Sequence, residues 1–256
     1  MTLRAPWIVL AACVVATMLP NDPVPTDPSH LNALPSVAHW LGTDHLGRDL
    51  LRRLGGALAT LALPGVLAAS VAVLGGTALG VGGSWMGEPT GNVCRAVSAA
   101  VLALPPLVTT LLVLMAAGAH AWSLGLAVGG VAAAQVGLRV AERVAALREA
   151  EFVLAARAHG IPDVRVLFHH VLRLSCGDVL LRGAVEAVTA VAALDVTLAY
   201  LGDLGVAEPT PSLGNVVVGA LESGSANPFA LVVTVVVLLA VTAPLAAYRH
   251  RPGTAA

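Results

Sequence analysis

Three ionisable residues lie in an apolar stretch in the last third of the chain. Arg182 and Glu186 are four residues apart, which places them on one face of a helix and allows an intrahelical ion pair. Asp195 follows in the same stretch. Charged groups inside a membrane helix usually face the bundle interior or a water-filled path. We predict a structural Arg182–Glu186 pair, whereas the position of Asp195 is equally consistent with a pore-lining and a structural role.

Other residue types that could carry chemistry are scattered. Of the eight histidines, His169 and His170 are adjacent, so they point to different faces of a regular helix and cannot share a metal ion. The sequence has no G-x-x-x-x-G-K-[ST] phosphate-binding loop, no nucleophile–base motif and no cluster with metal-ligand spacing. We therefore expect no catalytic residue, no metal site and no cofactor bound by this chain.

The composition is that of an integral membrane protein. The 256 residues are 57% hydrophobic and only 11% charged, whereas soluble domains carry about 25% charged residues. The net charge of −1 gives no basic field for nucleic acid, so we expect lipid and protein partners only. These numbers predict an all-α polytopic membrane fold.

Six apolar segments predict six transmembrane helices. They cover residues 6–19, 57–83, 93–118, 122–140, 179–201 and 229–248. The first is short, and a signal peptide is the alternative to a spanning helix; we favour the helix because no small-x-small cleavage pattern follows it. Pro105 and Pro106 should kink the third. We divide the chain into a first helix at 1–20, an outer loop at 21–56 and a five-helix core at 57–250.

Arginines orient this arrangement in the membrane. Six of them lie between residues 139 and 178, and Arg4 and Arg249 flank the first and last segments. Arginines near membrane helices mark the cytoplasmic side, and six helices put both termini on the side of the loop at about 141–175. The proline-rich stretch 21–56 is then outside, and we expect it to end in a short amphipathic helix carrying Arg52 and Arg53.

The cytoplasmic loop has its own helical pattern. Apolar residues recur at helical spacing over 152–159 and again over 164–172. Between them, Gly160 can end one helix in the left-handed conformation, Pro162 can open the next, and Asp163 favours a helix N-terminus. The pattern predicts a helix–glycine–helix elbow, which could be a docking surface or a loop packed on its own bundle.

This elbow resembles the "EAA" loop of ABC importer permeases. The residues at matching places are Ala155, Ala156, Gly160, Asp163, Arg165, Phe168 and His170. The resemblance implies that they couple the chain to an ATPase. Leu154 stands where the motif has glutamate, and Arg173 and Leu174 replace its final Pro-Asn. The missing glutamate removes one charge from the docking elbow.

Two further stretches resemble the peptide and nickel branch of that family. One is Gly42-Thr-Asp-His-Leu-Gly-Arg-Asp49, which supplies Gly42, Thr43, Asp44, Gly47, Arg48 and Asp49. The other joins Leu198-Ala-Tyr-Leu-Gly202 to Pro209-Thr-Pro-Ser-Leu-Gly-Asn215, in which Leu213 replaces the usual tryptophan. For Thr43, Asp44, Arg48 and Asp49 we favour a network that orders the outer loop over direct contact with solute.

The resemblance implies a six-helix type I ABC importer permease in a bacterial inner or plasma membrane, with both termini cytoplasmic. It also implies a second homologous permease, two ATP-binding subunits that use ATP and Mg²⁺, and an extracytoplasmic solute-binding protein. Transport would be by alternating access. The motifs are shared by carriers of peptides, nickel chelates and opines. The rival classes are a proton-coupled secondary carrier, which would have inverted repeats and acids on several helices, and a membrane-embedded enzyme.

Overall fold

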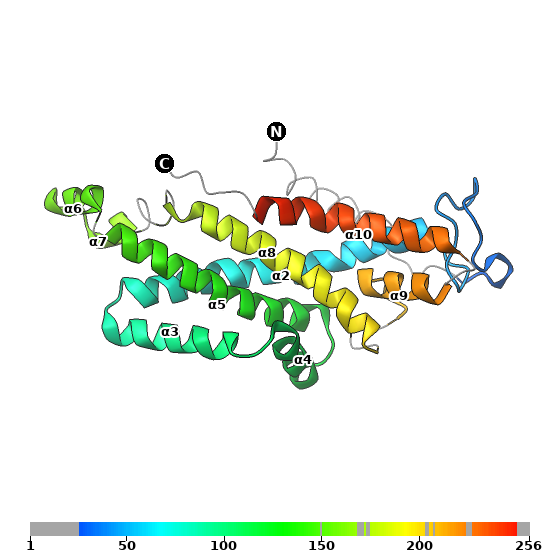
Figure 1. Ribbon diagram of the computed structural model, residues 1–256, viewed down its shortest axis with the longest axis horizontal. Helices are drawn as coiled ribbons and strands as arrows, with labels where there is room; N and C mark the ends of the chain where they lie inside the picture. The colour runs from blue at the N-terminus through cyan, green and yellow to red at the C-terminus, as the bar shows by residue number, and fades with distance from the viewer. Residues whose placement is uncertain are drawn as a thin grey trace.

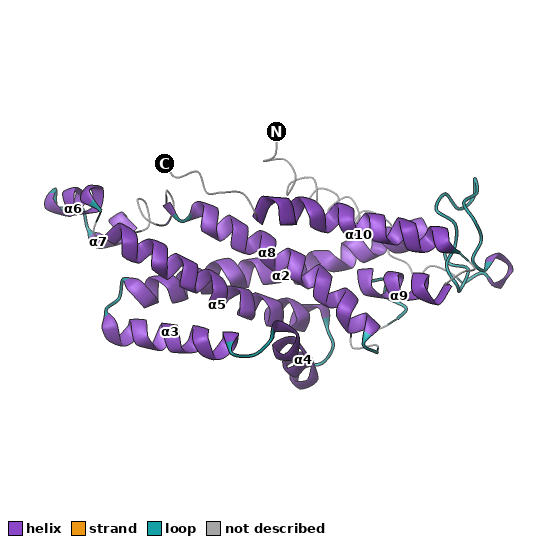
Figure 2. Ribbon diagram, viewed as in Figure 1, coloured by secondary structure: helices purple, strands orange, loops and turns teal. Residues whose placement is uncertain are grey.

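The computed structural model describes residues 26–148, 150–167, 172, 175–202, 205–206, 208–223 and 227–249. Every regular element within these ranges is a helix (Figure 2). In chain order they are the 3-10 helix η1 (Pro28–His30), α2 (Leu50–Ser84), α3 (Glu88–Leu102), α4 (Pro106–Ala117), α5 (Ala121–Arg148), α6 (Glu151–Ala158), α7 (Asp163–Arg165), α8 (Gly177–Tyr200), α9 (Leu213–Ser223) and α10 (Pro228–Arg249).

Helices α2, α5 and α8 form the centre of an elongated bundle (Figure 1). Small residues let α2 and α5 approach closely, which is how helices associate where no hydrophobic effect drives them together. A Cβ on Gly76 would lie 2.5 Å from Val136, and one on Gly80 would lie 2.5 Å from Val140. Gly76 and Gly80 of α2 are therefore part of its contact with α5.

The third predicted segment is broken rather than kinked. Helices α3 and α4 meet at 90° across a break of a few residues. Pro105 is extended, with φ −57° and ψ 139°, and Pro106 opens α4, because proline can begin a helix but cannot donate the hydrogen bond that would continue one. The Pro105–Pro106 pair thus ends one helix and starts another.

Two or three of the six predicted spans are long, apolar helices in the described part of the chain. In the described ranges, α2 and α5 are long and apolar enough to cross a membrane, and the α3–α4 pair makes a third if it is one bent span. Helices α8, with 24 residues, and α10, with 22, occupy the fifth and sixth predicted segments. The first predicted segment, 6–19, lies outside the described residues, so six spans stay a prediction.

The two motif-bearing loops lie at opposite ends of the bundle. Figure 1 places α6 and α7 at one end and residues 26–49 at the other. The short amphipathic helix expected before residue 56 is wrong as a separate element, because α2 already begins at Leu50 and contains Arg52 and Arg53. Asp49 caps it by accepting a 3.0 Å hydrogen bond from the Arg52 amide. A carboxylate at this position satisfies an otherwise unpaired N–H of the first turn.

Candidate functional site: the outer cluster and the elbow

The outer motif at residues 42–49 forms a tight turn. The Asp44 amide donates to the Arg48 carbonyl at 3.0 Å, and the Leu50 amide donates to the Gly42 carbonyl at 3.1 Å. Gly42 and Gly47 both have positive φ, at 79° and 74°. A Cβ on Gly47 would also lie 1.9 Å from the Asp27 carbonyl oxygen. Glycine is required there by both conformation and space.

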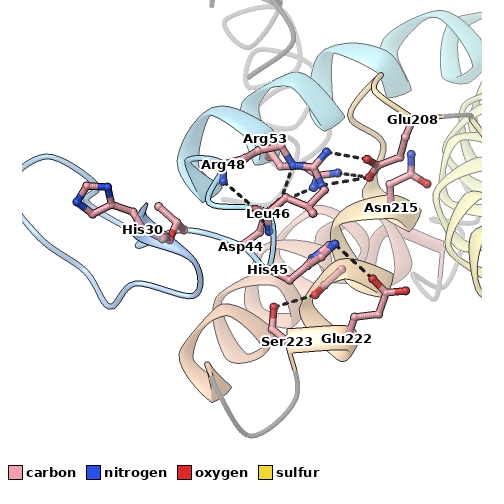
Figure 3. Close-up of polar contacts among 12 residues, drawn as sticks. His30, Asp44, His45, Leu46, Arg48, Arg53, Glu208, Asn215, Glu222 and Ser223 are labelled. Atoms are coloured by element: carbon pink, nitrogen blue, oxygen red, sulfur yellow. Dashed lines mark hydrogen bonds and ion pairs between the residues drawn. The ribbon is translucent and has the colours of Figure 1, made fainter. Parts of the chain in front are cut away.

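Four charged residues converge beside this turn, and we call them the outer cluster: Asp44, Arg48, Arg53 and Glu208 (Figure 3). Arg48 Nε donates to Asp44 Oδ2 at 2.8 Å, and Arg53 Nη1 donates to the same oxygen at 2.5 Å. Both guanidinium groups also reach Glu208, Arg48 at 2.6 and 3.3 Å and Arg53 at 2.9 Å. Asp44, Arg48 and Arg53 are buried, whereas the Glu208 side chain is 44% exposed.

The electrostatics of the outer cluster favour its charged form. Burial raises the pKa of Asp44, but hydrogen bonds from the Arg48 amide and from the Arg53 and Arg48 side chains outweigh it, so the pKa falls below its ordinary value. Hydrogen bonding from Arg48 likewise lowers the pKa of Glu208. The Asp44 and Glu208 carboxylates are therefore ionised at neutral pH.

The cluster joins parts of the chain that are far apart in sequence. Glu208 precedes α9 and is 160 residues from Arg48. Asn227, at the start of α10, donates to the Thr43 carbonyl at 3.2 Å, and His45 lies 3.4 Å from Glu222 of α9. The turn, which leads directly into α2, is therefore in contact with both α9 and the start of α10.

The predicted ordering network is present, but its membership differs from the expectation. Asp44 and Arg48 are directly paired, whereas Thr43 accepts from the Ala33 amide at 2.8 Å and Asp49 pairs with His39 at 2.9 Å. Sequence reasoning missed the roles of Arg53 and Glu208. Arg53 could have been suspected as a charge at the start of an apolar helix, but no local signal connects Glu208 to Asp44.

Asp195 connects α8 to α9. It is 5% exposed and accepts a hydrogen bond of 2.9 Å from the amide of Gly214, in the first turn of α9. A Cβ on Gly214 would lie 2.5 Å from the Asp195 carbonyl oxygen, so the two helices touch there. These contacts support the structural role for Asp195, and a pore-lining role is untested.

The elbow has the geometry that its sequence predicts. Helix α6 ends before Gly160, which has φ +75°, and Asp163 opens α7. Val153 and Val166 are fully buried against Val140 and Val144 of α5. The elbow is therefore packed onto one end of the bundle.

The opposite face of the elbow is open. Ala155, Gly160, Asp163 and Arg165 are exposed, and Ala156 is half-buried in the packed side. Phe152 and Leu154 add exposed apolar surface, at 46% and 52%. Phe168 and His170 lie outside the described residues, as do residues 169 and 171 of the predicted second stripe. The elbow therefore has one face fixed to the bundle and one face available to a partner.

The predicted intrahelical pair of Arg182 with Glu186 is wrong. Glu186 pairs with Arg139 of α5 at 2.8 Å, and Arg182 lies 3.9 Å from Asp178. Asp178 and Glu186 are each four residues from Arg182, so the spacing allows either pair. The close α5–α8 contact brings Arg139 to Glu186. This pair links α5 to α8, with the Glu186 side chain largely buried and the Arg139 side chain exposed.

In the described ranges, the chain is thus a helical bundle with the elbow at one end and the charged turn at the other. Residues 72–253 match the family described as binding-protein-dependent transport system inner membrane component, and the chain belongs to that family.

Curated relatives point to the same class. The chain is 30% identical to the dipeptide transport system permease protein DppC of Alkalihalophilus pseudofirmus, covering 80% of this chain and 67% of that protein. It is 32% identical to the nickel transport system permease protein NikC of Escherichia coli K12, covering 81% and 75% respectively. It is 28% identical to the oligopeptide transport system permease protein OppC of Bacillus subtilis, covering 77% and 64%. The family resemblance is confirmed, and the chain is a membrane permease rather than an enzyme.

Proposed function

We propose that this chain lines half of the translocation path of an ATP-driven importer for peptides or a similar small solute. A second permease lines the other half, two ATP-binding subunits supply energy from ATP and Mg²⁺, and an extracytoplasmic protein delivers the solute. The relatives named for dipeptide, oligopeptide and nickel transport support this solute range. The observation that carries the proposal is the elbow, which is packed on one face and exposed on the other.

The packing of the elbow suits it to transmit force. Val153 and Val166 have no exposed surface and interlock with Val144 of α5, and close-packed interiors move as units rather than deforming. Motion of an ATPase bound to the exposed face would therefore displace the inner ends of α5 and α8. The Phe152 and Leu154 side chains would provide apolar contact with that partner, where the family motif has a charge at position 154.

The proposal includes an orientation, which the opposite placement of the two loops supports. The elbow and Arg249 face the cytoplasm, and residues 26–49 face the extracytoplasmic side, where the binding protein arrives. Both termini are cytoplasmic in this proposal. The outer cluster keeps the outer ends of α2, α9 and α10 in register for that encounter.

The proposal is tested by reconstitution with its partners. The assembled importer is placed in liposomes, with binding protein and dipeptide on the side that corresponds to the outside of the cell. It should hydrolyse ATP and move the peptide to the other side. The chain alone should do neither, including under an imposed proton gradient. A Val153→Asp variant, which places a charge in the packed face of the elbow, should uncouple the complex, whereas Glu142→Gln on the exposed side of α5 should not. Robust gradient-driven uptake by the chain alone would favour the secondary carrier instead.

A further inference from the structure

A cavity at mid-height of the bundle has both space and charge. It has a volume of about 80 Å³ and lies between α4, α5 and α8. Its lining is mostly small or apolar, and the polar groups among the lining residues include Gln135, Glu186 and Thr110. A cavity needs only about 10–15 Å³ by this measure to hold one water. This one has room for an ammonium-sized group with its hydration.

Small side chains keep this space open. Ala132 of α5 and Ala187 and Ala190 of α8 face the cavity, and each leaves volume that a larger side chain would fill. Thr110 satisfies its own hydroxyl by donating to the Pro106 carbonyl at 2.8 Å. The other polar side chains in the lining are the Gln135 amide and the Glu186 carboxylate, which is itself paired with Arg139.

Glu186 is the negative charge of this cavity. Its carboxylate is held at 2.8 Å by Arg139, whose side chain is 41% exposed, while Glu186 itself is 18% exposed. An acidic group at this depth is expected to serve a solute or ion pathway and to have an identifiable partner. Arg139 is one such partner, and its side chain is partly exposed to water.

We propose that Glu186 and Gln135 form a subsite that recognises the amino group of the transported solute. A solute ammonium would replace the Arg139 guanidinium at the carboxylate, and the Gln135 amide oxygen would accept a second N–H. The Glu186 carboxylate thereby keeps a positively charged partner while the solute passes. This inference rests on the proposed function and specifies the group that the translocation path recognises.

The test measures the electrostatic preference of the cavity without requiring the natural solute. Ala190→Cys places a thiol on the cavity wall, in a background where Cys13, Cys94 and Cys176 are alanine. The assembled importer in nanodiscs is treated with aminoethyl or sulfonatoethyl methanethiosulfonate, and the two labelling rates are compared. Ala146→Cys, at the exposed end of α5, gives the intrinsic reactivity ratio of the reagents.

We expect the cationic reagent to be favoured about tenfold at position 190 relative to position 146, equivalent to about 1.4 kcal/mol. Adding Glu186→Gln should reduce this preference to within about twofold, and Glu186→Asp should retain part of it. Glycylglycine should slow labelling more than its N-acetylated form does, because only the former carries an ammonium group.

Two outcomes would overturn the subsite: a charge preference unaffected by Glu186→Gln, or equal protection by the free and acetylated peptides. ATP-dependent uptake by the wild-type complex is measured on the same preparation. If uptake is normal and the preference does not depend on Glu186, the subsite fails while the importer assignment stands. If uptake is absent, the proposed function itself fails.

Discussion

Replacing Asp44 by asparagine tests whether the outer cluster holds the outer end of the bundle together. Asp44 Oδ2 accepts from both Arg48 and Arg53, and Oδ1 accepts from the Leu46 and Arg48 amides at 2.9 and 2.8 Å. Asparagine is nearly isosteric and keeps one acceptor oxygen. It removes the negative charge and turns an amide N–H₂ group toward two guanidinium groups.

The expected cost is large because the arginines are buried. Breaking a buried ion pair by removing one partner costs about 3–5 kcal/mol, since an uncompensated charge is left behind. Glu208 remains, but its side chain is 44% exposed, and solvent-exposed pairs contribute about 0–1 kcal/mol. We therefore expect Asp44→Asn to favour local opening by about 3 kcal/mol, and Glu208→Gln by about 1 kcal/mol or less.

Hydrogen exchange of the assembled complex measures this difference directly. Since 1.36 kcal/mol is a factor of ten, about 3 kcal/mol raises the exchange rate of the protected amides in residues 42–53 about a hundredfold. Glu208→Gln is the matched control, because it removes a carboxylate charge from the same cluster. Equal effects of the two substitutions, or wild-type protection in Asp44→Asn, would refute the assignment of Asp44 as the centre of the cluster.

The pH dependence of hydrogen exchange is a second test of the role of Asp44. The folded-state pKa of Asp44 lies below its ordinary value of 3.8, so its stabilisation is fully present above that value and is lost as pH falls through the lowered pKa. Protection of residues 42–53 should therefore be constant above about pH 5 and decline below about pH 4. Asp44→Asn should lack this decline.

Three further substitutions test the elbow, the helix packing and the orientation. Gly160→Val should lower coupled ATP hydrolysis, because a β-branched residue is strained at a φ of +75°. It should not prevent assembly, because nothing lies within 4 Å of the added Cβ. Gly160→Asn, which tolerates this conformation, should retain more activity. Gly129→Ala should cost about 1–3 kcal/mol in thermal unfolding of the complex, because its Cβ would lie 2.8 Å from Val71, whereas the neighbouring Gly130→Ala meets nothing. Ser29→Cys should react with an impermeant thiol reagent from outside and Ala146→Cys only from the cytoplasm; the reverse pattern contradicts the orientation.

The sequence predicted the structure correctly where it depends on residues that are close together in the chain. Gly160 was predicted to be left-handed because it separates two helical stripes, and its φ of +75° confirms this. The fifth predicted segment, 179–201, corresponds to α8 at Gly177–Tyr200. Apolar periodicity, a glycine and a proline are short-range signals, so they can be interpreted without knowing the fold.

The same rules failed where the partner comes from a distant helix. The i, i+4 spacing paired Glu186 with Arg182, but α5 places Arg139 2.8 Å from Glu186. Glu208 joins the outer cluster across more than 150 residues, and Pro105 produces a 90° break whose angle depends on packing. Helix α9 was not predicted, because its 11 residues were too short to stand out as a span.

The last prediction concerns communication between the two ends of the chain. The outer cluster fixes the loop that precedes α9, and Asp195 of α8 accepts from the Gly214 amide at the start of α9. At the other end of α8, Cys176 and Val179 pack with the elbow's buried residues. Helix α8 therefore packs with the elbow at one end and reaches the outer cluster through the start of α9 and the loop before it.

A double-mutant cycle can determine whether this series carries energy. Substitutions more than about 10 Å apart usually add within about 0.5 kcal/mol, so independent ends predict that the effects of Asp44→Asn and Gly160→Val on uptake multiply. Suppose instead that α8 moves as one body. In the Asp44→Asn variant, whose outer end is already loosened, elbow motion then contributes little to uptake. The second substitution should then reduce uptake less than it does alone, with a coupling above about 1 kcal/mol. Gly130→Ala paired with Asp44→Asn supplies the additive reference, and additivity in both cycles would mean that the elbow acts without the outer cluster.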